Sequence, residues 1–447
     1  MIDKKLIRYR KAEYDIIKDK RYTEDQISFH LPIAINYRKP DKDYTINQDV
    51  QKILKENQDI NILGINRGER NLIYITIINQ NKEILYQKSL NVLQNYDWYE
   101  KLQQREMDRD NARKNWHTIE QIKNIKKGYI DNLLHEITTL MFKYNAIIAI
   151  EDINFGFAQK RTGISEKSIY MKFEEMLLKK LNYLVVKNRN ALEPGGIING
   201  YQMTPVLENM SKIGKQAGWV FFVPTYYISN IDPLTGYVNL LRTKDLKTIA
   251  AKEEFFQKLT TFHYNKESKN FIIDVDYKKF NIENYGKNAK WKLSTQGERT
   301  QYDADNNQYV STNITDELKK IFGENNINYQ DGHNLIGDIV KAENITQTKN
   351  SFFDKILNCI NLTVKMVNLS NNRENDYIIS PVKNQNEEYF DTRYADEKLP
   401  QCPDANGAYN IALKGLLLIQ RIQNHDEKKG KIKLAISNND WLSFMQN

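Results

Sequence analysis

Three positions in this chain place a carboxylate, or its amide, where a metal-dependent hydrolase needs one. Asn66 and Glu151 each end an apolar run typical of a buried strand, and Asp404 opens a long amphipathic stretch typical of a helix. Carboxylates gathered in this way hold two divalent ions about 4 Å apart, one activating water and one stabilising the leaving oxygen. A single acid at the end of a strand is more often a surface cap. Three positions in this order favour a nuclease-type site.

The elements that must position these residues follow an α/β pattern. Residues 60–65, 72–78 and 83–90 predict three strands separated by turn signals, and residues 97–143 predict a charged helical region. A strand, a helix, a strand and a late helix are expected next, at residues 146–150, 168–183, 218–223 and 405–421. Residues 231–402 are richer in Asn, Asp and Lys, and predict an inserted α+β domain.

The composition bounds the class of protein. A chain of 447 residues with 40% hydrophobic and 27% charged residues predicts two or three globular domains. The two cysteines, Cys359 and Cys402, exclude a disulfide framework and a four-cysteine zinc site. No apolar run has the roughly 18 residues of a membrane span, and the first residues lack the apolar core of a signal peptide. We therefore expect a cytoplasmic location and no membrane partner.

The formal charge of +8 is unevenly spread. Residues 1–39 carry a net +4 and residues 154–190 a net +5, so the rest of the chain is close to neutral. Basic stretches of this kind suit the phosphate backbone of nucleic acid, although a solvated surface is the plain alternative. The expected phosphate contacts are Arg67, Arg70, Lys160, Arg161 and Lys167.

Three longer motifs resemble those of a known family. LGINRGERNLIYITIIN (63–79), IAIEDINFGF (148–157) and DANGAYNIALKG (404–415) resemble the first, second and third RuvC motifs of type V-A CRISPR effector nucleases, the Cas-twelve-a family. The stretch from residue 14 to residue 37 resembles the last part of that family's wedge domain. DPLTGYVN (232–239) and DYIISPV (376–382) resemble landmarks of its Nuc domain.

The resemblance runs from end to end of this chain. It corresponds to the C-terminal third or so of a family member, without the recognition lobe, the PAM-interacting domain and most of the wedge. The implied fold is α/β: a RuvC-like RNase H fold with a bridge helix and an inserted α+β Nuc domain, preceded by a wedge-domain remnant. The implied boundaries are 1–59 for the wedge remnant, 60–96 for RuvC part I, 97–116 for the bridge helix, 117–230 for RuvC part II, 231–402 for the Nuc domain and 403–447 for RuvC part III.

The resemblance also implies the catalytic and metal-binding residues. They would be Asn66, Glu151 and Asp404, with Mg²⁺ as the cofactor and Mn²⁺ as its substitute in a two-metal site. The family has Asp where this chain has Asn66. An amide is neutral and offers a metal only one oxygen, so this exchange is expected to weaken the metal site.

Two further matches concern the handling of the nucleic acid strands. The resemblance places Val367 where the family has an Arg that helps position the target strand, and it retains Asp376. Valine neither donates a hydrogen bond nor carries charge, so strand positioning is expected to suffer as well. Lys18 and Tyr22 match positions implicated in processing of the guide-RNA precursor, but their partners are not in this chain. A solvated basic strand edge explains these two residues equally well.

The leading hypothesis is the nuclease half of a CRISPR RNA-guided DNA endonuclease, with guide RNA and target DNA as partners and with impaired phosphodiester hydrolysis. Two alternatives stay open. One is a catalytically inactive protein that binds single-stranded DNA or guide RNA. The other is a half-protein that needs a separately encoded N-terminal half.

Overall fold

The computed structural model describes residues 45–68, 70–111, 116–152, 164–207, 209–210, 214–342, 348–426, 430 and 432–447. Residues 40–447 form one compact unit. Within the described part, none of the helices combines the length and the apolar character needed to cross a membrane. Lys18 and Tyr22 lie outside the described residues.

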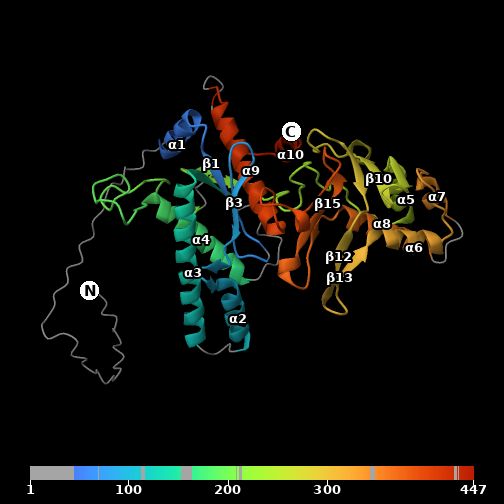
Figure 1. Ribbon diagram of the computed structural model, residues 1–447, viewed down its shortest axis with the longest axis horizontal. Coiled ribbons are helices and arrows are strands. Elements are labelled where there is room, and N and C mark those ends of the chain that lie inside the picture. Colours follow the sequence, from blue (N-terminus) through green and yellow to red (C-terminus); the bar gives the residue numbers. More distant parts are fainter. Residues whose placement is uncertain are drawn as a thin grey trace, which may run out of the picture. The chain divides into compact units, whose positions relative to one another are not determined.

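The centre of this unit is a six-stranded mixed sheet, of which Figure 1 labels β1 and β3. Its strand order is β3-β2-β1-β6-β8-β7. β1 pairs antiparallel with β2 and parallel with β6, which in turn pairs parallel with β8. The strands are β1 (Asn61–Asn66), β2 (Tyr74–Ile78), β3 (Ile84–Ser89), β6 (Ala146–Glu151), β7 (Gln216–Ala217) and β8 (Val220–Val223). Ile65 of β1 lies opposite Ile150 of β6, so Asn66 and Glu151 end neighbouring strands at the same edge.

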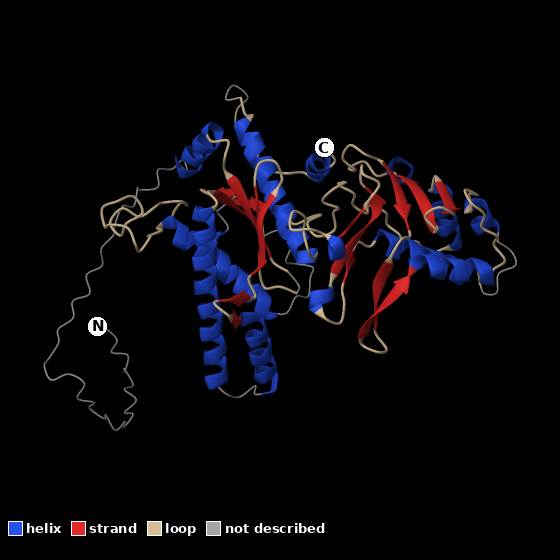
Figure 2. Ribbon diagram, viewed as in Figure 1, coloured by secondary structure: helices blue, strands red, loops and turns tan. Residues whose placement is uncertain are grey.

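Helices cover both faces of this sheet (Figure 2). In β1, Leu63 and Ile65 pack into a core shared with α3 and α4, whereas Ile62 packs into a second core shared with α1, α9 and α10. This division follows from the period of two along a strand. The helices are α1 (Thr45–Glu56), α2 (Trp98–Asn111), α3 (Trp116–Lys143), α4 (Ile164–Asn182), α9 (Pro403–Gln423) and α10 (Asn438–Met445). A mixed sheet covered in this way fits a RuvC-like fold.

The contact between α9 and β1 is unusually close because of Gly64. A Cβ atom added at residue 64 would lie 2.2 Å from the Ala408 carbonyl oxygen and 2.6 Å from the Ala412 nitrogen. Glycine therefore allows the helix backbone to approach the strand backbone. Gly407 leaves room on the helix side for the Asn66 side chain, because an added Cβ there would lie 2.4 Å from Asn66 Nδ2. This approach brings the first turn of α9 to the ends of β1 and β6.

Residues 231–402 contain both helices and strands, and buried side chains within this range form a hydrophobic cluster. The elements of this range are α5 (Ile249–Lys258), β9 (Thr261–Asn265), β10 (Asn270–Asp276), β11 (Lys290–Ser294), β12 (Glu298–Asp303), β13 (Gln308–Asn313), α6 (Ile314–Glu324), α7 (Ile336–Lys341), α8 (Lys349–Val364), β14 (Val367–Asn368), β15 (Tyr377–Lys383) and β16 (Tyr389–Asp391). Val367 and Asp376 both border the pairing of β14 with β15.

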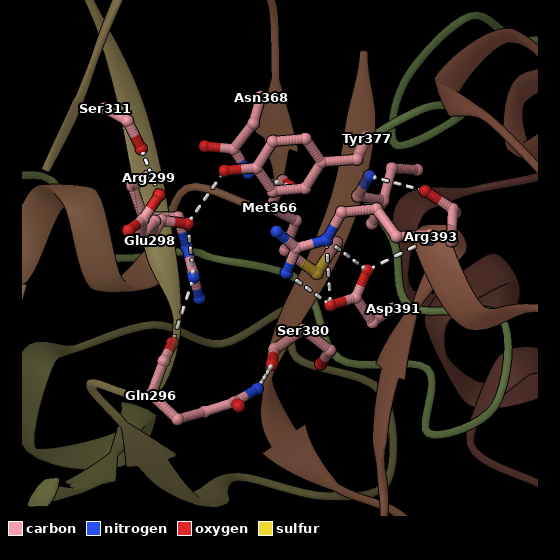
Figure 3. A network of polar contacts seen from close by, with 12 residues as sticks. Gln296, Glu298, Arg299, Ser311, Met366, Asn368, Tyr377, Ser380, Asp391 and Arg393 are labelled. Atoms are coloured by element: carbon pink, nitrogen blue, oxygen red, sulfur yellow. Dashed lines mark hydrogen bonds and ion pairs between the residues drawn. The ribbon is translucent and has the colours of Figure 1, made fainter. Parts of the chain in front are cut away.

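A buried arginine links β12 to the chain that enters β14. Arg299 has no exposed surface, and it donates through Nε to the Lys365 carbonyl oxygen at 3.1 Å and through Nη1 to the Gln296 carbonyl oxygen at 3.1 Å. Burial lowers the pKa of Arg299 to about 10. Nearby, Arg393 forms an ion pair with Asp391 (Figure 3). Its guanidinium carbon also lies 4.3 Å from the centre of the Tyr377 ring. These contacts hold β14, which contains Val367, and β15, which begins directly after Asp376.

The helical region predicted at residues 97–143 is confirmed by α2 and α3. One strand prediction needs correction in its detail. The predicted strand 218–223 begins at Val220, because Gly218 occupies a tight turn with φ +59° and an added Cβ there would lie 2.0 Å from the Met203 carbonyl oxygen. The edge strand β7 precedes this turn and was missed.

Candidate functional site

The three residues predicted to bind metal meet in one cavity of about 370 Å³. Asn66 comes from the end of β1, Glu151 from the end of β6 and Asp404 from the first turn of α9. The cavity is lined by Asn66, Arg67, Gly68, Arg70, Asn71, Glu151, Thr225, Ile228, Ser229, Asn230, Val367, Leu369, Arg373, Asp376, Cys402, Pro403 and Asp404. Residues far apart in the sequence therefore border a single space.

Asn66 is almost fully enclosed, with 5% of its surface exposed. Its Nδ2 donates to the backbone carbonyl oxygen of Asp404 at 3.1 Å. This bond joins the end of β1 to the start of α9. A carboxylate at residue 66 has no hydrogen to donate there, so the amide stabilises this arrangement of the chain while lowering its negative charge.

Asp404 is held by a network of amide side chains. Its Oδ2 accepts from the backbone nitrogen of Asn71 at 3.1 Å and from Asn71 Nδ2 at 2.6 Å. The Oδ1 of Asn71 in turn accepts from Ser89 Oγ at 2.6 Å and Asn91 Nδ2 at 3.0 Å. Sequence reasoning missed Asn71, since the carboxylate that it holds is 333 positions away.

The start of α9 suits an acidic side chain. Cys402 is the N-cap residue, with its Sγ accepting from the Ala405 nitrogen at 3.4 Å, and Pro403 follows it in the first turn. The helix dipole favours the negative charge of Asp404 in this turn. Burial raises the pKa of the Cys402 thiol to about 11, so this sulfur is protonated at neutral pH.

Glu151 is 7% exposed and lies next to a cation. Arg67 Nη2 is 3.8 Å from Glu151 Oε2, and the guanidinium lies over the Tyr170 ring at 5.4 Å from its centre. Arg67, which was predicted to contact phosphate, thus borders the predicted metal ligands directly. Behind this pair, Lys215 forms an ion pair with Asp152.

A buried carboxyl group on α4 faces this ion pair. Glu174 is 5% exposed, and burial together with the charge of Asp152 raises its pKa from 4.5 to about 8. The folded state therefore binds the Glu174 proton more tightly than the unfolded state does. Stability from this group is fully present below pH 4.5 and falls as the pH rises towards 8.

Glu174→Gln is expected to remove this pH dependence. The amide keeps the shape of the protonated acid and does not ionise. The free energy of unfolding of the unaltered protein should fall, relative to that of the variant, by roughly 1 kcal/mol or more between pH 6 and pH 9. Urea titrations at both pH values measure this difference. Parallel behaviour of the two proteins across that range would contradict the assignment.

The segment 231–402 contributes two predicted residues to the same cavity, Val367 and Asp376. Asp376 Oδ2 is 3.0 Å from Arg70 Nε, and Arg70 Nη2 also donates to the Ser370 carbonyl oxygen at 2.7 Å. Arg70 therefore joins the β1–β2 connection to the chain before β15. Lys160 and Arg161 lie outside the described residues, as does the side chain of Lys167.

The oxygen donors of this site are of the type that a hard divalent cation accepts, but they carry less negative charge than three carboxylates would. Glu151 and Asp404 supply carboxylate oxygens and Asn66 an amide oxygen, all of them ligands that Mg²⁺ accepts. Within the described ranges, three His, Cys, Asp or Glu side chains do not come together as a metal-binding group. The described site offers two carboxylates, Glu151 and Asp404, and one amide, Asn66.

One comparison with known families bears on this site. The family model described as RuvC nuclease domain matches residues 41–447 of the chain. The match includes Asn66, Glu151 and Asp404 together with the whole of the segment 231–402.

Proposed function

The chain belongs to the RuvC nuclease domain family, and on that premise we propose that it is the nuclease half of a CRISPR RNA-guided DNA endonuclease of type V-A with weakened cleavage. The observation that carries this proposal is the cavity shared by Asn66, Glu151 and Asp404 at the ends of β1, β6 and α9. In this proposal α2 belongs to the bridge helix at 97–116 and residues 231–402 form the Nuc domain. Guide RNA and target DNA are its proposed partners.

Glu151, Asp404 and the amide oxygen of Asn66 would hold Mg²⁺ at this cavity. When bound, Mg²⁺ activates water and stabilises the leaving oxygen of a phosphodiester. The protein's own part is to fix its ligands, through the Asn71 contacts to Asp404 and the Arg67 contact to Glu151. With one carboxylate fewer, the site offers less negative charge to the cation.

A second candidate function is nucleic-acid binding without cleavage. It is favoured by Asn66 at the predicted metal site and by Val367 where the resemblance expects an Arg. Single-stranded DNA is the simplest ligand for either function. With base reading left to a guide, binding by this chain would rest on backbone charge and stacking.

We expect the protein to bind single-stranded DNA with little sequence preference and with an affinity that falls steeply as salt rises. Fluorescence anisotropy over a salt series measures this. Cleavage of the same labelled strand with Mg²⁺ or Mn²⁺ separates the two functions: weak, metal-dependent cutting supports the nuclease, and binding alone supports the second candidate. An affinity that barely changes with salt would count against both.

A further inference from the structure

One face of α9 carries three buried polar side chains, Asn406, Asn410 and Lys414. All three have no exposed surface, although the helix is otherwise largely apolar where it is buried. Because they are spaced four residues apart, they lie on one side of the helix. They contact residues 224–231, called here the wall segment, which follows β8 and lines the cavity.

The wall segment is held through its backbone carbonyl groups. Lys414 Nζ donates to the carbonyl oxygens of Pro224 at 2.7 Å and Tyr226 at 2.5 Å. Trp441 Nε1 of α10 donates to the Tyr227 carbonyl oxygen at 3.1 Å. Tyr227 has a φ of +48°, a conformation that costs a non-glycine residue energy and needs such support.

The two asparagines bind the rest of the wall segment in the same way. Asn410 Nδ2 donates to the Ile228 carbonyl oxygen at 2.8 Å. Asn406 Nδ2 donates to those of Ser229 at 3.1 Å and Ile231 at 3.0 Å. Six of the eight carbonyl groups of the wall segment are therefore bonded to buried donors of α9 and α10.

These hydrogen bonds affect which groups of the wall segment are available to a ligand in the cavity. Thr225, Ser229 and Asn230 line the cavity beside Glu151 and Asp404. A phosphodiester presents only hydrogen-bond acceptors, so carbonyl oxygens facing it would be repulsive, whereas hydroxyl and amide groups donate to it. Six of the eight carbonyl groups are bonded to α9 and α10, so these six are not available to repel a phosphodiester. Thr225, Ser229 and Asn230, which line the cavity, carry hydroxyl and amide groups that can donate to it.

We propose that Thr225, Ser229 and Asn230 form an uncharged subsite for a phosphodiester next to the one at the carboxylates, and that Asn406, Asn410 and Lys414 are its positioning residues. This subsite rests on the proposed function, since it takes nucleic acid as the ligand. Its contacts read no bases. They add affinity without adding to the salt dependence, because releasing counterions requires charged groups.

The test uses the full chain, a labelled oligothymidylate and fluorescence anisotropy over a salt series in EDTA. The double variant Ser229→Ala with Asn230→Ala should bind about three- to tenfold more weakly, as expected for lost neutral hydrogen bonds, with an unchanged salt slope. Arg373→Gln, which removes a charge from the same cavity, should weaken binding and reduce the slope by about one.

Hydrogen exchange tests the positioning residues without nucleic acid. Lys414→Met should speed amide exchange in the wall segment but not in β1 or β6, and should weaken oligonucleotide binding severalfold. Lys252→Met is the matched control, since it removes another buried lysine, one that binds Asn350 and Asp354. It should leave exchange in the wall segment and binding unchanged.

The outcomes separate the two proposals. If the unaltered protein binds with a clear salt slope and the double variant binds equally well, the subsite is wrong and the proposed function stands. If the unaltered protein shows no salt-dependent binding, both fall together. Unchanged exchange in the wall segment of a folded Lys414→Met protein would overturn the positioning role. The double variant keeps the test decisive even if Lys414→Met does not fold.

Discussion

Asn66→Asp is expected to make the stability of this protein depend on divalent metal. The Asn66 amide donates to the Asp404 carbonyl oxygen at 3.1 Å. A carboxylate at residue 66 would instead place an acceptor oxygen opposite that carbonyl oxygen and add a negative charge beside Glu151. Without metal the variant should lose about 1–3 kcal/mol of unfolding free energy. With Mg²⁺ at a hundred times its dissociation constant it should regain about 2.7 kcal/mol. Thermal denaturation in EDTA and in Mg²⁺ measures both effects.

The same variant is expected to cut single-stranded DNA faster than the unaltered protein. Loss of an outer partner of a metal site typically costs roughly 10–100-fold in affinity or activity, and a direct ligand should matter at least as much. Asn66→Ala is the matched control, since it loses the hydrogen bond to Asp404 without adding charge. It should be destabilised similarly but gain nothing from Mg²⁺. Equal responses of both variants to Mg²⁺ would contradict the assignment of residue 66.

Gly64→Ala is expected to disturb the site, although residue 64 does not line the cavity. The added methyl group would lie 2.2 Å from the Ala408 carbonyl oxygen, which is backbone and has little freedom to move. Relief requires α9 to shift away from β1, and Asp404 would move with it. We expect a loss of about 3 kcal/mol in unfolding free energy, the upper range for overpacking. Urea denaturation measures it.

Gly323→Ala provides the control for this prediction. Gly323 lies within α6, and no atom comes within 4 Å of an added Cβ there. Because alanine favours the helix, this variant should gain about 0.5–1 kcal/mol. If Gly64→Ala proved as harmless as Gly323→Ala, the close packing of α9 on β1 would not be what positions Asp404.

The sequence predicted the central sheet and its helices because local patterns determine them. A run rich in β-branched residues marked β2, and the period of the buried stripe marked α3, where Ile130, Leu133 and Ile137 are buried as expected. The places of Asn66, Glu151 and Asp404 in the fold were predicted as well, since each lies at the end or start of such an element. The resemblance singled out Val367 and Asp376 for positioning of the target strand, and the structure places both in the lining of the same cavity.

The contacts that hold the site were not predicted, because their partners are distant in the sequence. Asn71 looks like an ordinary turn residue until Asp404 is placed beside it. The helix 405–421 was predicted from its apolar residues alone. Asn406, Asn410 and Lys414 interrupt that pattern at a spacing of four, and this regular interruption was the signal that could have revealed a buried polar face.

Calorimetric titration of Mg²⁺ into the unaltered protein, Asn66→Asp and Asn66→Asp with Glu151→Ala tests the central claim most directly. The claim is that residues 66, 151 and 404 form one cation site. It predicts weak binding by the unaltered protein, clearly tighter binding by Asn66→Asp, and loss of that gain when Glu151 is also replaced. A folded Asn66→Asp protein that gains no Mg²⁺ affinity, or a gain that persists without Glu151, would contradict it.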